Sequence, residues 1–319
     1  MSQLVIKRLC ALAAAAGLLA GPALLGAQTF PVKIVKLVIP FPVGGSSDAN
    51  GRIISPLLTE RWGQQLLFDF RPGAASVVGT DYTAKSPPDG YTLVLTSSQY
   101  TQNAGLVARL PFDPLTDLVP ITRVTRSPQA IVGHPSLPAK NIAELVALAR
   151  ARPNELNMGN AGSVLPSLLF NYLAKVKIQT VPYKGAGPMM IDAMGGHVPL
   201  AIGAISSVQG GVRSGRVRLL GVSSQSSAFP DAYIISKAVP GFDGDTWFGL
   251  MAPKGTPKEL VQKIRDDVAF ALRNPEVRQR LIDIGGEPSG ETPEEFAALI
   301  RTEVARWKEV VAAAGLTPQ

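Results

Sequence analysis

The stretch that decides the fold is KIVKLVIPFPVGGSSD, residues 33–48. Its first nine residues, Lys33 to Phe41, are mostly apolar and β-branched, which predicts a buried strand. A glycine-rich turn from Pro42 to Asp48 follows. Behind the turn, apolar residues recur at the spacing of a helix, namely Ile54, Leu58 and Trp62. The stretch therefore predicts a strand, a turn and a helix in succession.

The same succession continues along the 319 residues, which are enough for two domains. Further strands are expected at residues 65–70, 91–96, 178–182, 200–205, 217–222 and 247–252. Helix starts are expected where N-cap residues precede Glu, at Asn141, Thr256 and Thr292. Pro56 is expected to kink or divide the first helix. The pattern indicates an α/β fold with largely parallel strand pairing.

Glycine- and serine-rich turns follow a strand and precede a helix at residues 43–48, 97–101, 159–163 and 183–187. At the start of a helix the free backbone N–H groups and the helix dipole favour an anion, and glycine allows its close approach. In an open α/β sheet such turns gather at the carboxyl ends of the strands, where ligands bind. The turns therefore predict a site that holds an anion.

Signatures of catalysis and of cofactor binding are missing from the sequence. His134 and His197 have no carboxylate or serine at a spacing typical of a triad, and H-E-x-x-H, G-x-S-x-G and P-loop motifs are absent. Residues 159–163 lack the G-x-G-x-x-G pattern of a dinucleotide loop. We therefore expect no catalytic residue, no metal and no cofactor. An enzyme on this fold would have to use Asp48 with Lys184 as its acid and base.

The basic residues are scattered rather than clustered. The formal charge is +7, from 31 Lys and Arg against 24 Asp and Glu, and it falls to +5 without Lys7 and Arg8. Nucleic-acid binding needs a concentrated basic face, so it is not expected. A modest positive field still favours small anions.

The N-terminus has the pattern of a secretory signal peptide over residues 1–27. Lys7 and Arg8 precede an uncharged run rich in Leu and Ala, and the run ends in small residues at Ala27. The alternative is a membrane anchor, which the glycines and the proline of the run disfavour. We expect cleavage and a periplasmic protein. Cys10 lies in this leader, so the exported chain would contain no disulfide.

Seven sequence motifs along the mature chain resemble the Bug family, the extracytoplasmic substrate-binding proteins of tripartite tricarboxylate transporters. They are LVIPFPVGGSSD (37–48), FRPGA (70–74), SPPDGYTLVL (86–95), LPFDPLTDLVPITRV (110–124), VPYKGAGP (181–188), TWFGLMAPKGTP (246–257) and TPEEF (292–296). The resemblance runs in order over essentially the whole mature chain.

The resemblance implies the type II periplasmic binding protein fold, in which two α/β lobes enclose a ligand cleft. Lobe one would comprise residues 28–127 and 246–319, and lobe two residues 128–245, in a monomer. The residues that the resemblance assigns to the ligand are Phe41, Gly44, Gly45, Ser46, Ser47, Asp48, Ser97, Ser98, Asn160, Gly162, Ser163, Tyr183, Lys184, Gly185 and Ala204. Family members hold carboxylates mainly through backbone N–H groups and ordered water.

The sequence departs from the family pattern at Ser167, at Ala204 and over residues 230–234. Ala204 stands where a polar residue is common, which argues against an amino-acid ligand and favours a mono- or dicarboxylate with an apolar or aromatic body. The function implied is capture of a small carboxylate and its delivery to the transporter's membrane subunits. A sensor that presents the ligand to a membrane partner such as a sensor kinase is the alternative.

Overall fold

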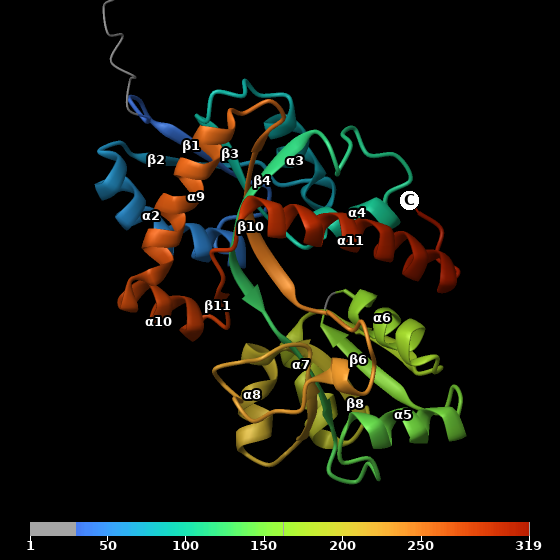
Figure 1. The fold of residues 1–319 in the computed structure, drawn as a ribbon. Coiled ribbons are helices and arrows are strands. Elements are labelled where there is room, and N and C mark those ends of the chain that lie inside the picture. Colours follow the sequence, from blue (N-terminus) through green and yellow to red (C-terminus); the bar gives the residue numbers. More distant parts are fainter. Residues whose placement is uncertain (1–29, 162, 319) are drawn as a thin grey trace, which may run out of the picture.

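The computed structural model describes residues 30–161 and 163–318. The expected leader and Gly162 lie outside the described residues. The described chain forms two lobes, each built on its own β-sheet, and Figure 1 shows them one above the other. Within these residues no helix is long and apolar enough to cross a membrane.

Lobe one contains a sheet of six strands. In order across the sheet they are β11 (Glu287–Pro288), β4 (Leu118–Ser127), β10 (Thr246–Pro253), β3 (Thr92–Ser97), β1 (Val35–Ile39) and β2 (Leu66–Phe70). Lobe two contains five, in the order β7 (Gln179–Tyr183), β6 (Asn157–Ala161), β8 (Leu200–Ala204), β5 (Gln129–Gly133) and β9 (Arg218–Val222). The chain leaves lobe one after β4, returns before β10, and so crosses between the lobes twice.

Strand direction differs from the expectation of largely parallel pairing. β1 pairs in parallel with β2 and β3, and β6 with β7 and β8. However, β10 runs antiparallel to β3 and β4, and β5 runs antiparallel to β8 and β9. The expectation was wrong for the strands that adjoin the crossings, because a strand that enters from the other lobe does not arrive through a βαβ connection.

The helices cover both sheets. Those of lobe one are α2 (Ser46–Trp62), α3 (Val77–Ala84), α4 (Gln99–Leu106), α9 (Lys258–Arg273), α10 (Pro275–Asp283) and α11 (Pro293–Ala313). Those of lobe two are α5 (Ile142–Ala151), α6 (Leu165–Ala174), α7 (Ala186–Gly195) and α8 (Ile205–Arg213). Short 3₁₀ turns occupy η2 (Ala74–Ser76) and η3 (Ile235–Lys237).

Local sequence signals explain some of the helix starts. Asn141 caps α5, and Thr292 forms the expected capping box with Glu295 at the start of α11. The cap expected at Thr256 was wrong: its hydroxyl donates to the carbonyl of Pro253, and α9 begins two residues after Thr256. Helix α2 is also undivided at Pro56, and the Arg52 carbonyl that the proline cannot bond accepts from the Ser55 hydroxyl at 3.4 Å.

Helix α11 takes part in the apolar cores of both lobes. Its first half packs Phe296 and Ile300 into the core under β10 in lobe one. Its second half carries Trp307 and Val310, which belong to the core cluster of lobe two together with Phe170 of α6. Figure 1 shows α11 lying along lobe one with its end above α6. The C-terminal helix therefore joins the lobes at a third place.

Candidate functional site: a cleft between the lobes

The candidate site lies between the lobes, where β1, β3, β6 and β8 reach their carboxyl ends. Two hollows occupy it. We call the first the α2 hollow; it measures about 240 Å³ and is lined by residues that include Gly44, Gly45, Ser46, Ser206 and Thr246. We call the second the α4 hollow; it measures about 270 Å³ and is lined by residues that include Ser97, Ser98, Gln102, Gln129, Ser163 and Ser207. Ala204 and Thr246 line both hollows, so these two residues lie where the hollows meet.

The starts of α2 and α8 adjoin the α2 hollow. The first hydrogen bond of α2 runs from the N–H of Ala49 to the carbonyl of Gly45, which leaves the N–H groups of residues 46–48 without intrahelical partners. In α8, the N–H of Ile205 donates to Pro128 of the crossing strand, and Ser206 is the next residue. Each helix start carries a partial positive charge. An anion in this hollow would therefore lie close to two such charges.

The starts of α4 and α6 adjoin the α4 hollow in the same manner. The N–H of Ser98 is fixed by the carbonyl of Trp247, and the next N–H, on Gln99, donates to the Ser97 hydroxyl. The N–H of Leu165 at the start of α6 donates to the Ser163 hydroxyl. Serine hydroxyls therefore order both turns, and each hollow receives helix starts from both lobes.

The described residues that line the two hollows include no Asp, Glu, Lys, Arg or His. Their side chains are hydroxyls, amides and apolar groups. Charge complementarity for a ligand must therefore come from backbone N–H groups and helix dipoles, which favour an anion. No group of three or more potential metal ligands occurs among residues 30–161 and 163–318.

Asp48 and the adjoining glycines shape the first turn. The Asp48 carboxylate accepts from the N–H of Gly44 at 2.9 Å and forms an ion pair with Arg52 at 2.6 Å. The positive φ that the turn requires belongs to Gly44, at +82°, whereas Gly45 is extended with φ of −77°. Asp48 is buried, so it organises the turn from behind the hollow.

Of the residues assigned from sequence, Gly162 lies outside the described residues, and the others fall into two groups. Those that line a hollow are Gly44, Gly45, Ser46, Ser97, Ser98, Ser163 and Ala204. Those that line neither hollow are Phe41, Ser47, Asp48, Asn160, Tyr183, Lys184 and Gly185.

Several of the residues outside the hollows have partners elsewhere in the protein. Asn160 is fully buried, where its side chain bonds the carbonyl of Met158 and the hydroxyl of Ser167. Tyr183 donates to Asp192 at 2.8 Å. Lys184 is exposed, on the turn after edge strand β7. No hydrogen bond or ion pair within the described chain joins Lys184 to Asp48, the pair that an enzyme would need.

Some cleft residues were not assigned from sequence. Ser206 and Ser207 follow the strand expected at residues 200–205, so the rule that selected the other turns would also have selected this pair. Gln129 and Thr246 carry no such signal, because they start β5 and β10 and reach the cleft only through the crossings. The Gln129 amide donates to the Thr246 hydroxyl at 3.3 Å, which joins the two crossing strands at the floor of the cleft.

A buried carboxyl group beside the cleft bonds to the segments in which the chain crosses between the lobes. Asp245, next to Thr246, accepts hydrogen bonds from Ser223 and, at 2.6 Å, from Ser224, and it lies 3.4 Å from Arg126 of β4. Burial and the charge of Asp243 raise its pKa, whereas the serines and Arg126 oppose the rise. The carboxyl thus ties β4 and β10 to the segment after β9.

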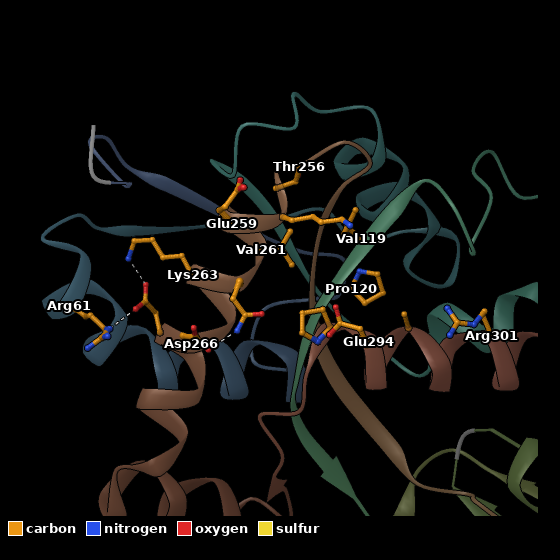
Figure 2. Close-up of a pocket in the computed structure, with 15 residues that line it drawn as sticks. Arg61, Val119, Pro120, Thr256, Glu259, Val261, Lys263, Asp266, Glu294 and Arg301 are labelled. Carbon is orange, nitrogen blue, oxygen red and sulfur yellow. Dashed lines mark hydrogen bonds and ion pairs between the residues drawn. The ribbon is translucent and has the colours of Figure 1, made fainter. Parts of the chain in front are cut away.

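A larger hollow, a groove of about 1040 Å³, lies on the outside of lobe one between α9 and α11. Figure 2 shows its floor at Val119 and Pro120, at the start of β4 and so at the opposite end of that strand from the cleft. Its charges are mixed, and Arg61 and Lys263 both pair with Asp267. The starts of α9 and α11 adjoin this groove, but they carry Glu259 and Glu294, whose charges oppose an anion, so we place the ligand site in the cleft.

Solved structures of similar proteins share this two-lobed architecture. A protein from R. palustris solved with adipate has a TM-score of 0.69 and 33% sequence identity, covering 91% of this chain and 100% of that one. MatC from Rhodopseudomonas palustris, solved with malate, has a TM-score of 0.67 and 30% identity, covering 88% and 100%. A TctC solute-binding protein from Polaromonas has a TM-score of 0.80 and 25% identity, covering 89% and 100%. Fold and cleft are therefore those of a periplasmic solute-binding protein.

Sequence comparison specifies the family within that class. The family model of the tripartite tricarboxylate transporter family receptor, TctC, matches residues 51–316. BugT of Bordetella pertussis is 35% identical over 298 residues, which cover 91% of each chain. The chain belongs to this TctC/Bug family, as the motifs predicted. The family and the fold are those of solute-binding proteins rather than enzymes.

Proposed function

We propose that the protein binds a small carboxylate in the cleft, closes its lobes on it, and delivers it to the membrane subunits of a tripartite tricarboxylate transporter. One observation carries the proposal: four helix starts, those of α2, α4, α6 and α8, meet at two hollows whose described lining has no charged side chain. Such a lining favours an anion over a cation or a neutral sugar, because the positive ends of four helices adjoin it, against the one negative end of α10 at Ile284.

The arrangement of the hollows favours a ligand with a carboxylate at each end. Each hollow adjoins helix starts from both lobes, and the two meet at Ala204 and Thr246. Because Ala204 offers a methyl group rather than a polar one, the middle of the ligand is expected to be apolar. Structures of two relatives with adipate and with malate support a dicarboxylate.

The family and the N-terminal sequence support export. We infer that residues 1–27 direct the chain to the periplasm and are removed there. The mature protein then acts as a monomer, collects its ligand in the periplasm and passes it to the transporter. We also infer lobe closure, because each hollow adjoins helix starts from both lobes.

A ligand panel tests the proposal. Adipate, malate, succinate, benzoate and terephthalate would be compared with glucose and with an amine of similar size by thermal unfolding and calorimetry. A carboxylate at about 100 times its Kd should stabilise the native state by roughly 2.7 kcal/mol. Scattering should show a more compact protein with the ligand.

Two controls separate binding in the cleft from binding elsewhere. Gly45→Val adds a branched side chain to the lining of the α2 hollow and should weaken binding by more than about 2 kcal/mol, whereas removal of exposed Lys184 should cost at most about 1 kcal/mol. Shifts with sugars or amines but with no carboxylate would refute the anion site. Loss of binding in Lys184→Ala with Gly45→Val intact would replace the backbone site by an ion pair.

A further inference from the structure

Glu303 is a fully buried acid on α11, directly behind the start of α4. Its Oε2 lies 2.6 Å from the hydroxyl of Thr101 in the first turn of α4. The same oxygen accepts from the indole N–H of Trp247 in crossing strand β10 at 3.0 Å. One carboxyl of the C-terminal helix therefore contacts both a wall of the cleft and a crossing strand.

A short chain of hydrogen bonds leads from Glu303 to the α4 hollow. The Thr101 hydroxyl lies 2.9 Å from the carbonyl of Ser98, and Ser98 lines that hollow. The Ser98 carbonyl also accepts from the N–H of Gln102, and the Ser98 N–H donates to the carbonyl of Trp247. The backbone at the start of α4 is thus fastened on both sides to groups that contact Glu303.

When Glu303 is ionised, this series of hydrogen bonds lacks one hydrogen atom. A threonine hydroxyl has a single hydrogen, so Thr101 can donate either to Glu303 or to Ser98. When Glu303 is protonated, its own hydrogen goes to Thr101, and Thr101 donates to Ser98. Every link is then satisfied, with the Trp247 N–H still donating to Oε2. Protonation therefore completes the hydrogen bonding at the start of α4.

The surroundings of Glu303 place its pKa close to neutral pH. Burial raises its pKa to about 7, the bonds from Thr101 and Trp247 and the charge of Arg306 lower it, and Asp243 raises it. The ion pair to Arg306 is long, at 3.6 Å. Arg123 of β4 also senses the charge of Glu303, but it is held by Glu291 through two bonds of 2.6 Å.

We propose that Glu303 is a positioning residue for the α4 hollow, and that its carboxyl takes up a proton when an anionic ligand binds there. An ionised Glu303 behind α4 opposes an anion in front of it, whereas the neutral acid leaves the helix start free to attract one. The proton comes from the acid form of the buffer and forms the O–H bond of Glu303. The inference rests on the proposed function, because it needs an anion in the cleft.

Calorimetry with adipate as the probe tests the inference on the mature protein. Titrations from pH 6 to 8, in two buffers of different ionisation enthalpy, give the number of protons taken up. We expect a fraction of a proton per adipate near pH 7. The Kd should rise towards pH 8, on the order of tenfold for each unit by which the bound anion raises the pKa of Glu303. Adipate binding with no proton uptake over this range would overturn the inference and leave the proposed function standing.

Variants assign the proton to its residue. Glu303→Gln keeps an oxygen that accepts from Thr101 and Trp247 but cannot titrate, so both the proton uptake and the pH dependence of Kd should shrink. Glu309→Gln makes the same change at an exposed position of α11 and should behave as the native protein. A Glu303→Gln protein that takes up protons as the native one does would overturn the inference.

A second variant decides the question if Glu303→Gln does not fold. Thr101→Val removes the hydroxyl that links Glu303 to the carbonyl of Ser98. The pH window of proton uptake should therefore shift, because this hydroxyl bonds both the ionised and the neutral acid. An unmoved window would contradict the assignment to Glu303. If no carboxylate binds at any pH, the failure is that of the proposed function itself, and the inference falls with it.

Discussion

Asp48 holds the backbone N–H of Gly44 at 2.9 Å, and this bond closes the turn that forms one wall of the α2 hollow. The bond joins a buried carboxylate to a glycine with φ of +82°. In the proposed anion site this acid would therefore not face the anion, because its charge is directed to the turn and to Arg52.

Loss of this acceptor should loosen the turn. Asp48→Ala leaves the Gly44 N–H and Arg52 without their partner, and we expect a loss of about 2 kcal/mol in the free energy of unfolding. Asp48→Asn keeps an acceptor for Gly44 and should lose less. Urea unfolding of both variants measures the difference. Equal losses would mean that the charge, rather than the acceptor, stabilises the turn.

The positive φ of Gly44 allows the effect of a substitution on stability to be distinguished from its effect on ligand binding. Gly44→Ala has open space for its methyl group, but its backbone is strained by about 1 kcal/mol. Gly215, with φ of +70° and equally open space, provides a matched control at the far end of α8. Both variants should lower the unfolding free energy to a similar extent, and only Gly44→Ala should weaken adipate binding in calorimetry. Equal binding by the two variants would place the ligand away from this turn.

A negative charge introduced at Ala204 should weaken the binding of an anionic ligand. Because Ala204 lies where the two hollows meet, Ala204→Asp would place a carboxylate between the two ends of a dicarboxylate ligand. At about 4 Å and an effective dielectric constant of about 20, the repulsion is roughly 4 kcal/mol, so the Kd of adipate should rise at least tenfold. Ala204→Asn has nearly the same shape without the charge and should lose less. Similar losses in both variants would indicate steric exclusion instead.

Glu303 should also make the stability of the protein depend on pH. Burial raises its pKa from 4.5 to about 7 in the folded state, so the folded protein holds this proton over a pH range in which the unfolded chain releases it. Its contribution is complete below about pH 4.5 and declines until about pH 7, by roughly 3 kcal/mol. Glu303→Gln should remove this decline in urea unfolding at a series of pH values. A variant that keeps the native slope would assign the decline to other groups, among them Asp245.

The N-terminal sequence predicts where the exported protein begins. We expect cleavage after Ala27, because the residues before Gln28 are small and the preceding run is uncharged. The intact mass and the N-terminal sequence of periplasmic protein measure this directly. A membrane-bound product that keeps residues 1–27 would contradict the prediction.

Local chemistry made much of the fold and part of the site predictable from sequence. The turn at Gly44 and Gly45 and the capping box at Thr292 depend on neighbouring residues, so their patterns are visible in the chain. Thr256 shows the limit, because its hydroxyl found a nearer acceptor in Pro253. The antiparallel direction of β5 and β10 follows from the crossings between lobes, which no local pattern records.

The same limit applies to the candidate cleft residues. Gln129 and Thr246 are separated by more than a hundred residues in sequence and meet only because both crossings pass the cleft floor. Asn160 fits a turn by its sequence, but the structure buries its amide against Ser167. The placement of a residue in a turn was predictable from sequence. The direction and partners of its side chain depended on the packing of distant elements.

Helix α11 has one half in each core, so a separation of the lobes would change the heat capacity of the protein. Any motion that draws α6 away from Trp307 and Val310 transfers apolar surface to water. Such a transfer has a positive heat capacity, about 0.45 cal/K/mol for each Å² exposed. An opening of this kind would therefore follow a curved dependence on temperature, and a carboxylate affinity measured at one temperature would include the hydration of a helix that lies outside the cleft.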